Sequence, residues 1–166
     1  RLSITPGVQF NYYSDFGSNF FPGLDVGLAI NQHLAAFANV GYTYRVPTYT
    51  DLYYSDPANL GNPNLLPEYA LSYEAGLKLI DSKILQGQLS YFVRNGKRII
   101  DWTKAQPADP WRPDNLIGVN MQGIDLSLTL KPARYMAVTA GYTYIDADKV
   151  SDLGFSRYAF ENLKHQ

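Results

Sequence analysis

The sequence predicts an all-β fold, an antiparallel up-and-down meander of about seven to eight strands. Apolar and polar residues alternate with a period of two along most of the chain, which is typical of strands with one apolar face. Tyr and Phe are abundant, with 14 and 8 copies among 166 residues, and strands favour aromatic side chains. Short and long connections also alternate between the predicted strands. No segment of useful length has a helical period.

Three strands are predicted in the first 45 residues. The first has an apolar face made by Leu2, Ile4, Val8, Phe10 and Tyr12. The second has Leu24, Val26, Leu28 and Ile30 on that face. The third has Leu34, Ala36, Ala38, Val40, Tyr42 and Tyr44. In each case the intervening residues are mostly polar or small, so one face of the expected sheet is apolar.

Four further strands follow with the same alternation, and an eighth is expected to begin near Arg157. Taken at every second residue, their apolar positions are Tyr69 to Leu79, Leu85 to Val93 without Gly87, Ile124 to Leu130 and Met136 to Tyr144. The opposite face of these strands contains Glu74, Lys78, Arg94 and Asp125.

Connection lengths predict which ends of the strands lie together. Short turns are expected at 31–33, 81–83 and 131–134, and long connections at 13–22, 46–67, 103–116 and 146–156. In an antiparallel meander, all short turns then lie at one end and all long loops at the other. Transmembrane barrels show this asymmetry, with short periplasmic turns and long extracellular loops.

Two observations favour a membrane barrel over a soluble one. Strands of about 10–12 residues are long enough to cross a bilayer, which needs about 9–11. Tyrosines also gather near the long-loop ends, as in the aromatic girdle of membrane barrels: Tyr12, Tyr13, Tyr42, Tyr44, Tyr142 and Tyr144. Alternation alone fits either class, so a soluble lipocalin-like ligand-binding barrel stays open as an alternative.

Three motifs between residues 44 and 78 carry a resemblance to a known family. They are RVPTYTDLYY at 45–54, GNPNLLPE at 61–68 and YEAGLK at 73–78. In this order and spacing they resemble the late-barrel signature of TonB-dependent outer-membrane receptors, and a weaker resemblance covers most of the chain. Such receptors import iron siderophores, haem or cobalamin.

The resemblance implies part of a large transmembrane β-barrel in the bacterial outer membrane, of about 22 strands with a plugged lumen. Residues 1–166 would form a partial barrel domain, with the plug and the remaining strands outside this sequence. The implied partners are a small-molecule ligand, outer-membrane lipid, and TonB through the missing plug. A complete small eight-stranded barrel with a structural or adhesive role is a further alternative.

Other classes of function have little support. A net charge of −1 gives no basic field for nucleic acid, and the absence of cysteine excludes thiol chemistry. No enzyme motif occurs, and His33 and His165 have no credible catalytic partner, so we expect neither an enzyme nor a bound cofactor. Asp146, Asp148 and Asp152 crowd one loop but lack the Gly and Glu of an EF-hand, so no metal site is expected.

Two long loops contain candidate ligand-binding residues. Loop 46–66 has Tyr49, Tyr53 and Tyr54, which can stack on a ligand or simply pack against neighbouring loops. Loop 103–115 has Trp111 and Arg112, a pair suited to a flat or anionic ligand. Packing is the alternative there too, but this loop lies outside the shared motifs and is the better candidate for specificity.

The isolated piece is expected to self-associate, most simply as a homodimer. Its predicted sheet has two unpaired edges, and its apolar face is broader than soluble monomers usually expose.

Overall fold

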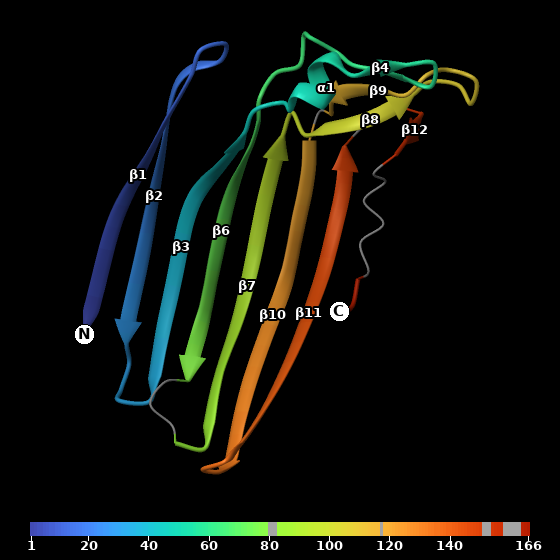
Figure 1. Cartoon of the computed structure of the whole chain (residues 1–166). Coiled ribbons are helices and arrows are strands. Elements are labelled where there is room, and N and C mark those ends of the chain that lie inside the picture. Colours follow the sequence, from blue (N-terminus) through green and yellow to red (C-terminus); the bar gives the residue numbers. More distant parts are fainter. Residues whose placement is uncertain (80–82, 117, 151–153, 158–163) are drawn as a thin grey trace.

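Seven long strands form one antiparallel sheet whose order follows the sequence, β1-β2-β3-β6-β7-β10-β11. The computed structural model describes residues 1–79, 83–116, 118–150, 154–157 and 164–166. The strands are β1 Leu2–Tyr13, β2 Gly17–Ala29, β3 Leu34–Arg45, β6 Glu68–Leu79, β7 Leu85–Lys97, β10 Gly118–Ala133 and β11 Met136–Val150. They lie side by side in a gently curved row (Figure 1), which confirms the predicted meander.

Small elements form a second layer at one end of this sheet. They are α1 Tyr49–Tyr53, β4 Ser55–Asp56, β5 Asn59–Leu60, β8 Ile100–Lys104, β9 Arg112–Asn115 and β12 Phe155–Ser156. β12, β8 and β9 make a three-stranded sheet, and β4 pairs with β5. All of them gather at the end of the sheet where the long connections lie (Figure 1). We call this layer the rim.

The rim corrects the expectation of plain loops. The sequence stretches 46–67 and 103–116 contain a helix and short strands that are too brief for a periodic pattern to reveal. The connection expected at 13–22 is also wrong, because β1 and β2 are joined by residues 14–16 alone, with Gly17 in the left-handed region at φ 69°. Likewise β11 runs to Val150, well into the connection expected at 146–156.

The remaining turns agree with expectation where they can be described. Residues 30–33 join β2 to β3, close to the expected turn at 31–33, and a register shift after Leu130 accompanies the turn between β10 and β11. Most of the expected turn 81–83 lies outside the described residues. Beyond β11, His165 makes an antiparallel bridge with Tyr144. Strand pairing therefore continues past the seventh strand, although residues 158–163 of the expected eighth are outside the described part.

The strand registers align the apolar positions on one face of the whole sheet. One row crosses all seven strands through Ile4, Val26, Ala38, Ala75, Tyr91, Ile124 and Tyr144. The adjacent row, on the opposite face, passes through Thr5, Asp25, Asn39, Glu74, Phe92, Gly123 and Ile145. The predicted alternation is thus confirmed in phase along every strand. We call the two faces the apolar face and the polar face.

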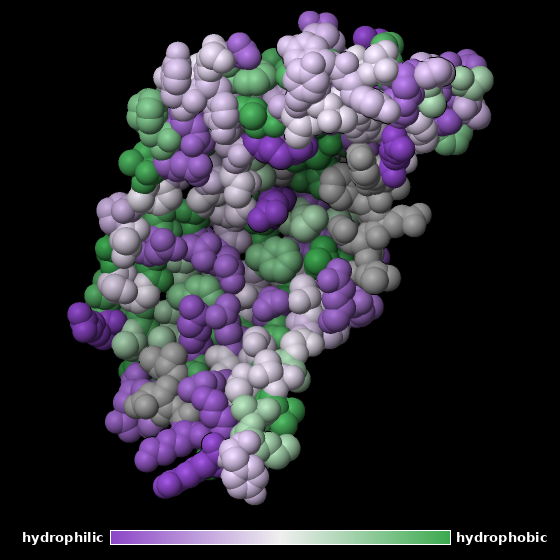
Figure 2. Space-filling model, in the orientation of Figure 1, coloured by the Kyte–Doolittle hydropathy of each residue, from purple (hydrophilic) through white to green (hydrophobic). Residues whose placement is uncertain are grey.

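Two phenylalanines on the polar face cover glycines on the neighbouring strand. Phe37 pairs with Gly76, and Phe92 pairs with Gly123. A Cβ atom on Gly123 would lie 2.6 Å from the Phe92 ring, and one on Gly76 would lie 2.8 Å from that of Phe37. The same Cβ atoms would lie even closer to backbone carbonyl oxygens, of Tyr144 and of Leu89 respectively, so glycine is required at both positions. The face seen in Figure 2 has hydrophilic side chains with hydrophobic ones between them, as this mixture predicts.

Burial concentrates near the rim rather than across the sheet. The buried apolar side chains are Leu65, Ala70, Ile100, Trp102, Leu116 and Val119. The apolar face is largely uncovered, and Val8 is 70% exposed. Among the described residues, no helix is long and apolar enough to span a membrane. Self-association of the isolated piece remains a prediction.

Substitutions on β10 test which face meets lipid. Leu126 lies on the apolar face, whereas Thr129 lies on the polar face with its hydroxyl 3.1 Å from that of Thr139. Leu126→Arg should reduce the folding free energy of the complete barrel in lipid by about 2–4 kcal/mol, because a guanidinium at mid-bilayer depth is poorly solvated. Thr129→Arg is the matched control and should cost much less. Equal losses in equilibrium unfolding would show that the two faces are assigned wrongly.

Candidate functional site

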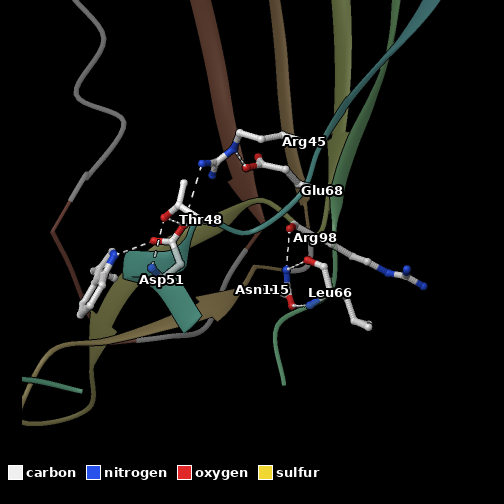
Figure 3. Close-up of polar contacts among 8 residues, drawn as sticks. Arg45, Thr48, Asp51, Leu66, Glu68, Arg98 and Asn115 are labelled. Carbon is white, nitrogen blue, oxygen red and sulfur yellow. Dashed lines mark hydrogen bonds and ion pairs between the residues drawn. The ribbon is translucent and has the colours of Figure 1, made fainter. Parts of the chain in front are cut away.

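The two long connections of the rim are joined into one body by backbone and amide hydrogen bonds. The side chain of Asn115 accepts from the Leu66 amide at 2.8 Å and donates to the Leu66 and Arg98 carbonyls at 2.9 and 2.8 Å. This cluster is visible in Figure 3. Trp111 also exchanges backbone hydrogen bonds with Ala58 and Leu60, each 2.8 Å long. The position of one connection therefore fixes that of the other.

A second cluster centres on the carboxylate of Asp51, which is 8% exposed. It accepts hydrogen bonds from the Thr48 amide at 3.0 Å, the Thr48 hydroxyl at 2.7 Å and the Trp102 indole at 3.1 Å. The Arg45 guanidinium lies 4.0 Å away and forms an ion pair with Glu68, its partner in the strand register. Figure 3 shows Arg45, Glu68, Thr48 and Asp51 together. A buried charge is tolerated here because several donors surround it.

The local sequence explains why Asp51 has this position. Thr48 caps α1, and Asp51 is the third residue of the helix, so the two side chains bond reciprocally to each other's backbone. This is a capping box with Asp in the place usually held by Glu or Gln. The remaining oxygen of Asp51 is then free to face β8 and meet Trp102. The T-x-x-D spacing was a signal for this element that strand periodicity could not supply.

A cavity of about 600 Å³ lies beside the Asp51 cluster. Its lining includes the polar side chains of Arg45, Thr48, Asp51, Tyr54, Asn59, Glu68 and Arg157, together with Ile99, Ile100 and Trp102. Such a wall offers hydrogen-bond donors and acceptors beside one aromatic surface. It suits an uncharged or zwitterionic ligand with many polar groups better than an apolar one.

The predicted tyrosines take different positions around this cavity. Tyr54 lines it and donates a 2.7 Å hydrogen bond to Asp56. Tyr49 and Tyr53 lie next to each other on α1, with ring centroids 5.1 Å apart and ring planes tilted by 52°, and they are 78% and 55% exposed. These two rings are open to a ligand above the rim but do not line the cavity.

Hydrogen bonds around Asp56 hold the loop near Tyr54 in shape. The bond from the Tyr54 hydroxyl, followed by those from the Asn59 side chain and the Ala58 amide, keeps the pKa of Asp56 below its ordinary value. The same carboxylate raises the pKa of Tyr54, first through that hydrogen bond and then through its charge. Asp56 therefore stays ionised, and its hydrogen bonds weaken only as pH falls through its lowered pKa.

Trp111 and Arg112 are adjacent in sequence but have different surroundings. Two cations lie over the Trp111 ring: Lys104, at the end of β8, is 4.7 Å from its centroid, and Arg157, from beyond β11, is 5.9 Å from it. Arg112 is exposed and lines a separate hollow beside β8 and β9. The structure thus pairs Trp111 with Lys104 and Arg157 rather than with Arg112.

Sequence reasoning missed most of the cavity wall. Arg45, Asp51 and Glu68 lie in or beside one long connection, whereas Trp102 and Arg157 come from distant segments, and only their contacts reveal the site. Within the described residues, no group of three His, Asp or Glu side chains could hold a metal ion. Of the aspartates considered as a calcium loop, Asp146 has its Oδ1 atom 3.8 Å from Nζ of Lys164, and Asp152 lies outside the described residues.

Removing the indole donor tests the role of the Asp51 cluster. Trp102→Phe keeps an aromatic ring but deprives the buried carboxylate of one hydrogen bond, which typically costs about 1.5–3 kcal/mol for a charged acceptor. Amide hydrogen exchange should then accelerate in residues 46–67 and 98–116, while the long strands stay protected. Tyr53→Phe, at an exposed ring, is the control and should change nothing. Unaltered exchange in Trp102→Phe would mean that the cluster does not hold the rim.

Curated relatives match nearly the whole chain. A vitamin B12 transporter, BtuB, from Vibrio vulnificus is 31% identical over 150 residues, which is 90% of this chain and 24% of the relative. BtuB from Photobacterium profundum is 29% identical over 161 residues, 95% of this chain and 26% of the relative. The chain thus spans about a quarter of the length of the curated relatives it matches.

Solved structures share the fold at lower identity. The siderophore receptor PirA from Pseudomonas aeruginosa has a TM-score of 0.73 at 22% identity, covering 89% of this chain and 29% of that one. PirA from Acinetobacter baumannii has a TM-score of 0.72 at 22% identity, with coverages of 93% and 27%. The family model described as "TonB dependent receptor-like, beta-barrel" matches residues 1–164. The chain therefore belongs to the TonB-dependent receptor family and forms part of an outer-membrane β-barrel.

Proposed function

We propose that the protein imports a bulky, hydrogen-bonding ligand of the cobalamin class across the bacterial outer membrane. The observation that carries this proposal is the polar rim cavity beside Trp102, found in a chain whose two curated relatives are named vitamin B12 transporters. Iron siderophores and haem are the other ligands that the family resemblance suggests. Import would be driven by TonB, acting on a plug segment outside this sequence.

Charge balance at the rim supports a corrinoid over a highly anionic iron chelate. The cationic side chains between residues 45 and 68, 97 and 117, and 154 and 157 are Arg45, Lys97, Arg98, Lys104, Arg112 and Arg157. The acidic ones are Asp51, Asp56, Glu68, Asp101, Asp109 and Asp114. Six charges of each sign give these segments no net attraction for a polyanion. An amide-rich ligand needs no such field and can use the neutral donors and acceptors of the cavity.

We assign direct ligand contact to five residues of the rim: Trp111, Arg112, Tyr49, Tyr53 and Tyr54. The cations over Trp111 hold its ring in place beside two positive charges. Tyr49 and Tyr53 offer a second, exposed aromatic surface on α1. Tyr54 joins this surface to the cavity. The five residues therefore offer a ligand separate contact surfaces on the rim, of which only Tyr54 lines the polar cavity.

Binding assays on the complete receptor test this proposal. Cyanocobalamin should bind, and a ferric tricatecholate siderophore should not. Trp111→Ala should weaken cobalamin binding by about tenfold, the effect of losing a buried aromatic anchor, and should weaken it more than Tyr53→Ala. Tyr135→Ala is the aromatic control, because Tyr135 is 93% exposed in the turn at the other end of the sheet. Tight binding of the siderophore alone, or a loss confined to Tyr53→Ala, would contradict the assignment.

The proposal requires the rim to face the cell exterior. Long loops mark the external end of outer-membrane barrels, and every element of the rim belongs to the long connections. A cysteine at Ala108, in the β8–β9 connection, should react with a membrane-impermeant maleimide on intact cells. A cysteine at Gln32, in the short β2–β3 turn, should react only after the outer membrane is permeabilised. Labelling of position 32 but not 108 on intact cells would reverse the orientation.

A further inference from the structure

Arg98 is the one non-glycine residue with positive φ in the part of the chain that the structure describes, at 56°. The left-handed conformation is unfavourable for a side chain of this length, and such outliers persist only where their surroundings enforce them. Asn115 enforces it here, by donating a 2.8 Å hydrogen bond to the Arg98 carbonyl from an amide that also clamps Leu66. A strained backbone that is held this firmly indicates that the direction of the Arg98 side chain matters.

The Arg98 side chain projects from the rim on the side of the apolar face. In Figure 3 it extends away from the Arg45–Glu68 pair. Its guanidinium lies over the Tyr69 ring, 5.8 Å from the centroid. Tyr69 pairs with Tyr44 and Lys97 in the strand register, and both share its apolar face. Arg98 and Lys97 therefore place two cations at the upper border of the band that faces lipid.

Beside these cations lies a groove of about 610 Å³ with an aromatic lining. Its walls come from the β1–β2 hairpin on one side and from β3, β6 and the rim on the other: Phe20, Phe21, Tyr42, Tyr44, Leu66 and Tyr69, with Arg98 at its border. Asp15 is the one acidic residue of this lining. Phe20, Tyr42 and Leu66 are 65%, 36% and 49% exposed, so an apolar chain could contact all three.

The groove exists because β2 and β3 separate toward the rim. Their pairing covers only Leu24–Ala29 with Ala35–Val40, whereas β3 pairs with β6 along its whole length. Above Leu24, side chains fill the gap, with Phe21 4.9 Å from Tyr44 between ring centroids and the Asn19 amide 3.3 Å from the Tyr44 hydroxyl. Open strand edges are not tolerated in the hydrocarbon region, so this gap belongs at the level of the lipid headgroups.

We propose that this groove binds a phosphorylated lipid of the outer leaflet, with an acyl chain against Phe20, Tyr42 and Leu66 and a phosphate on Arg98 and Lys97. Arginine forms charge-assisted, bidentate bonds to phosphate, and basic pockets at headgroup depth are lipid sites. A soluble anion would use the cations but not the aromatic groove. A second protein chain would not need a cation held in a strained conformation at headgroup depth. The outer leaflet follows from the orientation proposed above, whereas the binding itself does not depend on that orientation.

Native mass spectrometry of the complete receptor in detergent tests the site. The probe is diphosphorylated lipid A, compared with its dephosphorylated form. The wild type should retain the phosphorylated lipid preferentially. Arg98→Asn should lower its retention about tenfold, since asparagine accepts the left-handed backbone but cannot bind phosphate. Arg94→Gln removes a cation from the polar face, where Arg94 bonds to Ser72, and should leave retention unchanged.

Three results would overturn the proposal. One is equal retention by the wild type and Arg98→Asn, with both variants folded as judged by heat-modifiable gel mobility. Another is equal retention of the two lipid forms, which would indicate an apolar groove that detergent or any acyl chain fills. The last is displacement of the lipid by millimolar inorganic phosphate, which would make this an anion site. None of these outcomes depends on whether the receptor imports cobalamin, so the two proposals fail separately.

Discussion

The register of the seven-stranded sheet is the constraint on which the rest of the structure depends. Side chains in a strand alternate with a period of two, so a shift of one residue in any pairing would move that strand's apolar side chains to the other face. Here the row from Ile4 to Tyr144 remains in phase across six pairings. In a membrane this agreement is required, because lipid meets one face and every backbone donor and acceptor must be paired within the barrel.

The same register positions the rim. Arg45 and Glu68 end adjacent strands as direct partners, so the charge pair that borders the cavity is placed by the sheet itself. From there Thr48 and Asp51 turn the chain into α1, and Trp102 ties that helix to β8. Asn115 then joins the two connections and strains Arg98 outward. The Asp51 carboxylate thus holds residues around the polar cavity, and the Asn115 side-chain amide holds Arg98 at the aromatic groove.

The strands, and the residues of each strand that share a face, could be predicted from the sequence, because alternation over ten or more residues is a strong local signal. The strands of the rim could not, since β8 and β9 are short and depend on contacts with residues far away in sequence.

Trp102 shows the limit most clearly: it lies next to the predicted loop, yet its role rests on a hydrogen bond to Asp51 across 51 positions. The positions of Phe37 and Phe92 on the polar face could not be predicted for a different reason. An aromatic ring among polar residues is an exception to the alternation, and it is explained only by the glycine opposite it on the neighbouring strand, which the sequence alone does not identify. Trp111 was predicted as a candidate from the sequence, but the cations over its ring were not, because their approach depends on the fold: Lys104 lies at the start of the same connection and Arg157 comes from a distant segment. Whether it contacts ligand remains a prediction.

The most direct test of the central claim is a spin-label accessibility scan along β10 of the complete receptor in lipid vesicles. Nitroxides placed one at a time from Ile124 to Leu130 would be exposed to oxygen, which partitions into lipid, and to a polar nickel reagent, which stays in water. The strand register predicts oxygen accessibility at positions 124, 126, 128 and 130, and lower values at 125, 127 and 129. An oscillation of opposite phase, or none, would contradict a barrel wall with its apolar face toward the membrane.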